Sequence, residues 1–366
     1  MIKTILIVTA MLFITYSNCC APNTDELLSV VVVFRHGNKM PKQEYFDVYP
    51  NNPWMNPELW NNSDLGSVTN ASKISIYERG KWLRQRYTEL LPEKYSKRSV
   101  RVRSSDSDRV LASAQLLLAG LYPPKDADVW NSQLHWQPIP IHSVPETDDM
   151  ILSQRVPCPR FKKMLDRHLT SRSDQLHQVE YVANHTGKAI KSLDDVYKLY
   201  KLLRIVEENG LTLPKWAIEA MPLLKQQSEL VFTTYSLTKE MQRLVSGPFF
   251  HTVLKHFDTV LSKPDRGPKM LLLAAHARTI ANALMALDAY KEQPPYSSAL
   301  MFELRKDCKG VVRLSCYYQT AAKGAPSEIL KDEPYKSFKA RLKRIAVDPE
   351  TWHRECKSWS MFGGGD

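Results

Sequence analysis

The sequence predicts an α/β fold in which buried strands alternate with helices. Residues 27–34 and 270–275 are short and almost continuously apolar, and residues 100–103 alternate valine with arginine. These patterns are typical of strands in a parallel sheet that is covered on both faces. Helical patterns at 108–121 and at 279–290 follow the second and third strands, and each ends at a pair of prolines. In such a sheet the ligand crevice lies at the carboxyl ends of the strands.

The beginning of the chain has the pattern of a secretory signal peptide, which we assign to residues 1–20. Its apolar run is too short to span a bilayer. We therefore expect a secreted, extracellular protein without a membrane span. Secreted chains carry surface glycans at Asn-x-Ser/Thr sequons. Three sequons begin at Asn61, Asn70 and Asn184.

The mature chain is expected to divide into two domains. Residues 149–250 have helical periodicity, many lysines and few strand-like runs, so we assign them to a helical cap inserted into the fold. Residues 21–148 and 251–366 would then form the α/β core. Within this core, an amphipathic pattern at 77–92 predicts a further helix.

Cysteines suggest how the two ends of the mature chain are held. Cleavage after Cys20 would leave an even number of cysteines, which indicates two disulfides in an oxidising compartment. The four are Cys158, Cys308, Cys316 and Cys356. Residues 300–305 and 311–318 predict a hairpin in which Cys308 and Cys316 would bond, and Cys158 would pair with Cys356. The sequence has no clustered Cys/His spacing, so we expect no metal site and no cofactor.

The charge balance favours anionic ligands. The 366 residues include 50 Lys and Arg against 39 Asp and Glu, a net charge of +11, in an otherwise ordinary globular composition. Such an excess suits phosphate groups, acidic lipids or acidic heparin-like glycans, and it can also serve solubility alone. Zinc-finger, RNP and helix-turn-helix patterns are absent, so nucleic acid is not an expected partner.

Cationic and imidazole side chains follow the ends of the three predicted strands. They are Arg35, His36, Lys39, Arg103 and His276. Arginine holds phosphate oxygens in a bidentate manner, lysine adds a point charge, and a helix that begins after His276 would direct N–H groups at the same anion. A neutral histidine can attack phosphorus directly. Each residue alone is equally well explained as a surface charge or a packed core histidine, but their coincidence at three strand ends favours a site.

The segment RHGNKMP at 35–41 resembles the RHGxRxP motif of histidine acid phosphatases. Further likenesses are VRVRSSDSDRVLASA at 100–114, WQPIPIHSVP at 136–145, and LLAAHA before a helix, which is similar to the family's HD segment. The resemblance extends over most of the mature chain. It implies a histidine-phosphatase-like α/β core with a mixed, mainly parallel sheet flanked by helices, a smaller, mostly helical cap, and a disulfide between Cys158 and Cys356.

The resemblance also implies a role for each site residue. In active members the first histidine is the nucleophile, arginines and the later histidine hold the phosphate, and the following aspartate protonates the leaving alcohol. Transferred to this sequence, His36 is the nucleophile, and the phosphate is held by Arg35, Lys39, Arg103 and His276. The proton-donor position is Ala277, which cannot donate a proton. Loss of a general acid costs about 10²–10⁴-fold in rate.

This departure favours a binder over an efficient enzyme. The chain also resembles the acid-phosphatase-like proteins of flea saliva, which look like phosphatases stripped of catalytic residues and used to sequester host mediators. That resemblance implies a salivary scavenger of biogenic amines such as serotonin, or of cysteinyl leukotrienes. The alternative is a weak acid phosphatase that hydrolyses phosphomonoesters through a phosphohistidine at His36.

The two ligand classes need different side chains. Leukotriene carboxylates suit the cationic crevice, to which Arg278 adds a charge. An amine needs a carboxylate or an aromatic face. Asp106 and Glu303 are candidate carboxylates, for an amine or as a replacement acid, if they point inward. Tyr197 and Tyr200 are candidate aromatic residues in the cap, where ordinary packing is the other explanation.

Overall fold

The computed structural model describes residues 25–60, 64–171, 180–264 and 267–357. The predicted signal peptide and the sequon at Asn61 lie outside these ranges, so both stay predictions. Asn70 and Asn184 are exposed, the first at the start of one helix and the second within another. Nowhere in the described ranges is a helix long and apolar enough to cross a membrane.

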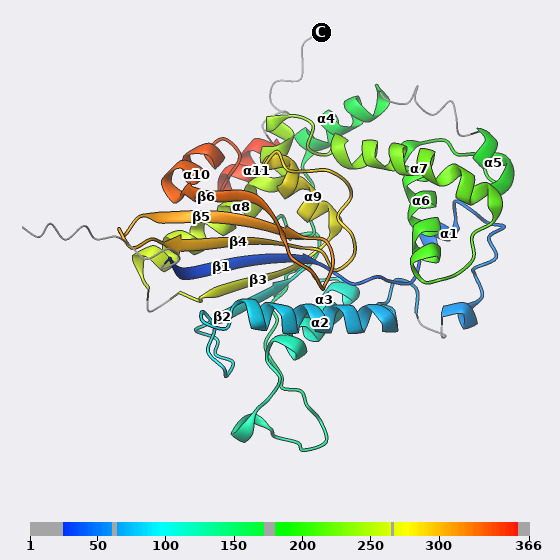
Figure 1. Cartoon of the computed structure of the whole chain (residues 1–366). Coiled ribbons are helices and arrows are strands. Elements are labelled where there is room, and N and C mark those ends of the chain that lie inside the picture. The colour runs from blue at the N-terminus through cyan, green and yellow to red at the C-terminus, as the bar shows by residue number, and fades with distance from the viewer. Residues whose placement is uncertain (1–24, 61–63, 172–179, 265–266, 358–366) are drawn as a thin grey trace, which may run out of the picture.

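A six-stranded mixed sheet forms the centre of the molecule (Figure 1), in the order β2-β3-β1-β4-β5-β6. The strands are β1 (Glu26–Arg35), β2 (Val100–Ser104), β3 (Met270–Ala275), β4 (Ala299–Lys306), β5 (Val312–Gln319) and β6 (Ser327–Pro334). Parallel pairing is confined to β2-β3-β1, and the other pairings are antiparallel. Because β3 lies between β1 and β2, the carboxyl ends of all three strands meet at one edge, as the sequence predicted.

Helices cover both faces of the sheet, which explains why β1 is almost continuously apolar. On one face, α2 (Asn70–Arg86) and α3 (Asp108–Leu121) pack on Val30 and Val32. On the other, α8 (Lys239–Ser262), α9 (Ala277–Ala286) and α10 (Tyr335–Leu342) pack on Val31 and Val33. Alternate side chains of a strand point to opposite faces, so both sets of valines are buried. Figure 1 shows the two helical layers above and below the sheet.

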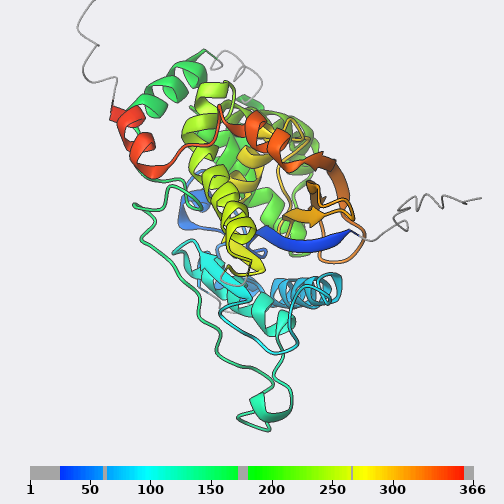
Figure 2. The same ribbon diagram turned by 90° about the vertical axis from the view of Figure 1, so that its left-hand side faces the viewer.

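Close packing of α2 on α3 requires glycine at the contact. A Cβ atom on Gly80 would lie 2.1 Å from the carbonyl oxygen of Leu117, and one on Gly120 would lie 2.1 Å from that of Tyr77. Real Cβ atoms do not approach oxygen so closely, so the two glycines fix how near the helices lie. After α3, the segment that contains the short 3-10 helix η2 (Asp126–Asp128) extends away from the body (Figures 1 and 2).

The cap lies beyond the carboxyl ends of the parallel strands (Figure 1). Its helices are α4 (Pro159–Thr170), α5 (Glu180–Thr186), α6 (Leu193–Glu208) and α7 (Lys215–Thr234), and the short helices α1 (Gln43–Phe46) and η1 (Pro57–Trp60) pack with them. The boundary that we expected at residue 250 falls inside α8. Phe249 and Phe250 belong to the apolar cluster that covers the sheet, so α8 runs without a break across the expected division.

One of the two predicted disulfides is confirmed. Cys158, at the start of α4, is bonded to Cys356 in α11 (Pro349–Lys357). The predicted bond between Cys308 and Cys316 is wrong, because Cys316 is a free, buried thiol. Cys308 is disulfide-bonded, but not to Cys316. Cys308 lies in the turn, whereas Cys316 pairs with Phe302, the fifth residue pair from that turn. A strand rises about 3.3 Å per residue, so the two Cα atoms are too far apart for a disulfide.

Candidate functional site

A cavity of about 340 Å³ lies where the parallel strands end beneath the cap. Its walls come from the segment after β1, the first turn of α3, the loop before α4, helices α6 and α7, and the start of α9. Of the five cationic and imidazole side chains predicted at the strand ends, four line it, namely Arg35, His36, Lys39 and His276. The edge of the sheet therefore brings together residues that are separated by up to 241 positions in the chain.

His36 is held as a neutral imidazole with one unprotonated nitrogen that faces Arg109. Its Nδ1 lies 2.8 Å from the carbonyl oxygen of Gly37, so Nδ1–H donates there. Its Nε2 accepts from Nε of Arg109 at 3.4 Å. Burial, followed by the charges of Arg109 and Arg35, holds the pKa of His36 well below the ordinary histidine value. A neutral ring with an unprotonated Nε2 is the form that a phosphorus nucleophile needs.

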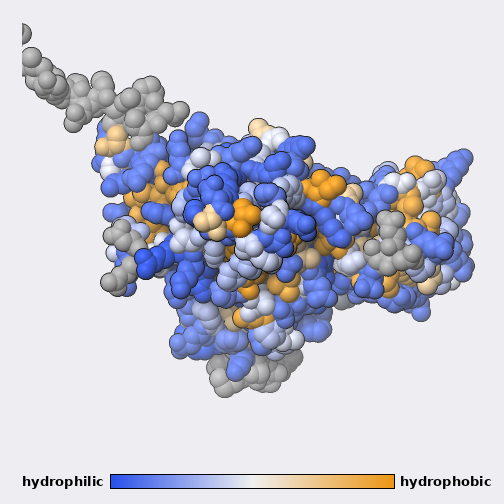
Figure 3. Space-filling view, turned by 90° about the horizontal axis from the view of Figure 1, so that it is seen from below, coloured by the Kyte–Doolittle hydropathy of each residue, from blue (hydrophilic) through white to orange (hydrophobic). Residues whose placement is uncertain are grey.

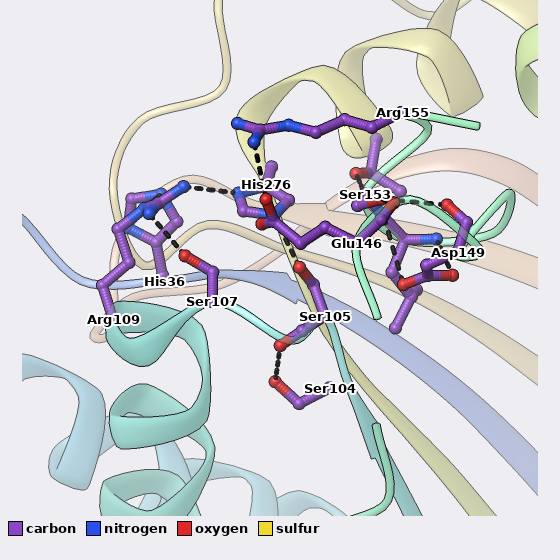
Figure 4. A network of polar contacts seen from close by, with 12 residues as sticks. His36, Ser104, Ser105, Ser107, Arg109, Glu146, Asp149, Ser153, Arg155 and His276 are labelled. Carbon is purple, nitrogen blue, oxygen red and sulfur yellow. Dashed lines mark hydrogen bonds and ion pairs between the residues drawn. The ribbon is translucent and has the colours of Figure 1, made fainter. Parts of the chain in front are cut away.

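Arg109 connects the two histidines (Figure 4). Its Nη2 lies 3.3 Å from Nδ1 of His276, whose Nε2 is 2.9 Å from Oγ of Ser105. Ser107 accepts a hydrogen bond from the same guanidinium. Burial and then the Arg109 charge hold the pKa of His276 well below its ordinary value. Both rings are therefore neutral, and they flank a guanidinium that forms no ion pair with any carboxylate in the described ranges.

The floor of the cavity carries buried positive charge. Arg35 is 3% exposed, donates to the carbonyl oxygen of Pro294 and stacks 3.6 Å from the centroid of the Tyr296 ring. Lys39 is 3% exposed and donates to its neighbour's carbonyl oxygen at 3.2 Å. Burial, followed by the Arg109 charge, lowers the pKa of Lys39. Throughout the part of the chain that the structure describes, Arg35, Lys39 and Arg109 form no ion pair. Uncompensated buried charge is costly, so the cavity favours an anion that neutralises it.

Arg103 does not belong to this site, contrary to the sequence prediction. Its Nη2 instead donates at 2.8 Å to Asp149, a fully buried carboxylate that also accepts backbone N–H bonds from the loop before α4. Arg109 lines the cavity in its place. Arg103 is still within β2, whereas Arg109 stands in the first turn of α3, two residues beyond the loop. The segment RSSDSDR at 103–109 contains both arginines. Arg109 is the one that follows the strand and stands at the start of the next helix, and this position is the sequence signal that could have identified it.

Comparison with known proteins decides the family. A model described as the histidine phosphatase superfamily (branch 2) matches residues 26–317. This chain belongs to that family. It is 33% identical over 357 residues to prostatic acid phosphatase of Homo sapiens, covering 93% of this chain and 90% of that one. It is 32% identical over 343 residues to lysosomal acid phosphatase of Rattus norvegicus, covering 90% and 79%.

Solved structures show the same fold. The phytase of Hafnia alvei in complex with tartrate superimposes with a TM-score of 0.67 at 18% identity, covering 89% of this chain and 98% of that one. The Klebsiella sp. ASR1 phytase gives a TM-score of 0.63 at 18% identity, covering 88% and 96%. At this identity the likeness supports the fold alone. The predicted family and its histidine-phosphatase-like α/β fold with a mixed sheet are confirmed, but the sheet is not mainly parallel, because three of its five described strand pairings are antiparallel.

Ala277 places a methyl group in the wall of the cavity. It is the first residue of α9, directly after His276, and is 9% exposed. The two carboxylates suggested for the pocket are elsewhere. Asp106 is exposed and accepts from Ser143, and Glu303 is buried in β4 between Arg86 and Arg305. Both predictions are wrong. The strand β4 is buried on both faces, so Glu303 points into an internal ion-pair cluster rather than toward the strand ends.

Other acidic groups stand closer to the site. Within the described residues, the carboxylates that line the cavity are Glu44 on α1 and Asp194 on α6, each paired with a lysine. Glu146 has an oxygen 3.9 Å from Nε2 of His276 and forms a close ion pair with Arg155 (Figure 4). The described ranges contain no group of three or more His, Cys, Asp or Glu side chains placed to hold a metal ion.

The remaining pocket candidates divide between wall and core. Arg278 lines the cavity and stacks 3.8 Å from the centroid of the Tyr235 ring. Tyr197 lines it as well. Tyr200 does not: it is 3% exposed, packs in the core of the cap, and borders a different hollow. One side of α6 lines the cavity, and another side packs in the cap interior. Tyr200 lies on the side that packs in the cap, so ordinary packing explains it.

Proposed function

We propose that this chain uses the pocket of a branch-2 histidine phosphatase to bind small host mediators, without efficient turnover of phosphomonoesters. The observation that carries the proposal is Ala277, which follows His276 at the start of α9, where the family pattern has a proton donor. The rest of the anion site keeps its cationic character, although Lys39 stands where the family motif has arginine and so lacks the guanidinium fork. Binding is retained, therefore, while protonation of a leaving alkoxide is lost. The signal-like pattern at residues 1–20 supports a secreted protein.

The floor of the pocket suits the acidic groups of a cysteinyl leukotriene. Arg35, which is buried, and Arg109, which is half-buried, are forks that bind carboxylate in a bidentate manner, and Lys39 adds a point charge. The rings of Tyr197 and Tyr296 give the wall apolar surface. A volume of about 340 Å³ is in the range of small-molecule pockets. The ligand that these features favour is an organic anion with an apolar body.

A biogenic amine such as serotonin would take the cap side of the same cavity. Glu44 and Asp194 line it there, together with the rings of Tyr45 and Tyr197. A carboxylate and an aromatic face are the groups that attract an ammonium. The site is off-centre, because Arg35 and Arg109 repel a cation at the floor. This arrangement supports an amine subsite that is built from residues the sequence did not single out, Tyr197 excepted.

The second candidate function is a slow acid phosphatase, which the geometry of His36 favours. Its Nε2 lone pair would attack phosphorus and form a phosphohistidine as the leaving oxygen departs with the bonding electrons. Water would then cleave the phosphohistidine. Without an acid at position 277, leaving groups of low pKa are favoured over alcohols.

Calorimetric titration tests the binder proposal. The natural protein is titrated separately with serotonin and with a cysteinyl leukotriene, and a parallel sample is assayed for phosphate release from a phosphomonoester. We expect saturable binding of at least one ligand and very slow phosphate release. Absence of binding together with rapid turnover would replace the proposal with the phosphatase function.

A further inference from the structure

Lys201 is a buried amine in the pocket that neither proposed function uses. It stands on α6, is 3% exposed, and lines the same cavity as His36 and Arg109. Its Nζ lies 5.4 Å from the centroid of the Tyr296 ring, the ring on which Arg35 stacks at 3.6 Å. Among the described residues it has no ion-pair partner.

Positive charge surrounds this amine. Arg35, Lys39 and Arg204 are its cationic neighbours, and Glu208 is the acidic one. Glu208 is already paired with Arg204 at 2.7 Å. Burial first, and the charge of Arg35 second, hold the pKa of Lys201 well below the ordinary lysine value. Its amine therefore keeps a free lone pair under conditions in which surface lysines are protonated.

Two other pocket lysines provide the contrast. Lys198 stands one turn earlier on α6 and lines the cavity, but it pairs with Asp194 at 2.7 Å, and this hydrogen bond raises its pKa. Lys39 is buried, but its Nζ donates to the carbonyl oxygen of Met40 and lies over the ring of Tyr45. Lys201 combines burial, cationic neighbours and an amine without such a hydrogen bond.

We infer that Lys201 is a covalent capture site for small aldehydes or ketones that carry an anionic group. Arg35 and Arg109 would hold the anion, and the carbonyl carbon would meet the Lys201 amine within the same cavity. Desolvation beside other cations is an established way to activate a lysine nucleophile. The amine lone pair adds to the carbonyl carbon, and the resulting carbinolamine loses one water to give an imine. The step is neither an oxidation nor a reduction.

This inference goes beyond the proposed function, since it requires neither amine binding nor phosphate release. It rests on the cationic floor and on Lys201, and not on position 277. Binding of a leukotriene can therefore fail while imine formation succeeds, and the reverse also holds.

The test uses pyridoxal 5′-phosphate as the probe. The natural protein is incubated with it at mildly acidic pH, the imine is reduced with cyanoborohydride, and the modified lysine is located by peptide mass spectrometry. We expect one main adduct, at Lys201. Inorganic phosphate, or the use of pyridoxal without its phosphate, should slow labelling by about tenfold or more, because charge-assisted hydrogen bonds anchor the probe.

Variants supply the matched controls. Lys201→Arg removes the nucleophilic amine and should lose the adduct, whereas Lys198→Arg on the same helix should keep it. Mapping of the natural protein stands on its own if Lys201→Arg does not fold. The inference is overturned by an adduct mainly on Lys39 or Lys198, by labelling spread over surface lysines, by indifference to phosphate, or by no adduct. The mass of the Lys201 adduct also separates the two proposed functions, because a phosphatase would leave pyridoxal without its phosphate.

Discussion

Exchange of Arg109 for methionine should weaken anion binding and leave the fold intact. The guanidinium contacts Nε2 of His36 at 3.4 Å and Nδ1 of His276 at 3.3 Å, so an anion between the histidines would contact it directly. A hydrogen bond to a charged group contributes about 1.5–3 kcal/mol. Arg109→Met should therefore lower affinity for inorganic phosphate by about ten- to 150-fold. Removal of this half-buried cation, which forms no ion pair with any carboxylate that the structure describes, should not lower the free energy of unfolding.

Arg103→Met is the matched control, because it removes the same group from the arginine that the sequence placed in the site. It should leave phosphate affinity unchanged, since Arg103 lies outside the cavity. It should instead destabilise the fold by about 1–3 kcal/mol, because the buried carboxylate of Asp149 loses its cationic partner. Calorimetry with inorganic phosphate and urea unfolding measure the two quantities. Equal loss of affinity in both variants, or less than about twofold loss in Arg109→Met, would refute this assignment.

Three further perturbations follow from the structure. Replacement of Cys158 and Cys356 by serine opens a bond between positions 198 residues apart and should lower stability by about 2–5 kcal/mol, measured by urea unfolding, with ligand affinity unchanged. The pKa values of His36 and His276 are lowered in the folded state, so the unfolded chain binds protons more readily at these residues. The free energy of unfolding should therefore fall as pH drops below about 6.5, the ordinary histidine pKa. A thermal-melting series against pH that is flat across this range would contradict the assignment. Asp194→Asn should weaken serotonin binding by about two- to tenfold while leukotriene binding stays the same, as competition titrations would show.

The sequence was most informative where one physical requirement dominated. β1 and β3 are buried on both faces, so their continuous apolar runs marked them almost to the residue, and the ends of parallel strands necessarily placed Arg35, His36 and His276 together. The helix after β2 was placed correctly at 108–121. The helices predicted at 77–92 and 279–290 begin earlier, at Asn70 and Ala277. Helix ends depend on backbone geometry at a few residues, which periodicity does not encode.

What the sequence could not show was which of several equivalent side chains turns toward the pocket. Arg103 and Arg109 stand in one short segment, and only the direction of β2 and the start of α3 separates them. Glu303 has the right chemistry but belongs to a cluster inside the sheet. The pocket role of Lys201 depends on its exposure and its neighbours, which no local pattern reports. Surface hydropathy was no better guide, since the face in Figure 3 is mostly hydrophilic with small separate apolar patches.

The most direct test of the account compares turnover of p-nitrophenyl phosphate and of an alkyl phosphomonoester at acid pH by the natural protein, Ala277→Asp and Ala277→Asn. The account predicts slow turnover by the natural protein and by Ala277→Asn, and a gain of about 10²–10⁴-fold in Ala277→Asp toward substrates with alcohol leaving groups. The gain should be smaller for p-nitrophenyl phosphate, whose leaving group needs less protonation. Rapid turnover by the natural protein, with no gain from aspartate, would contradict the claim that position 277 separates binding from catalysis.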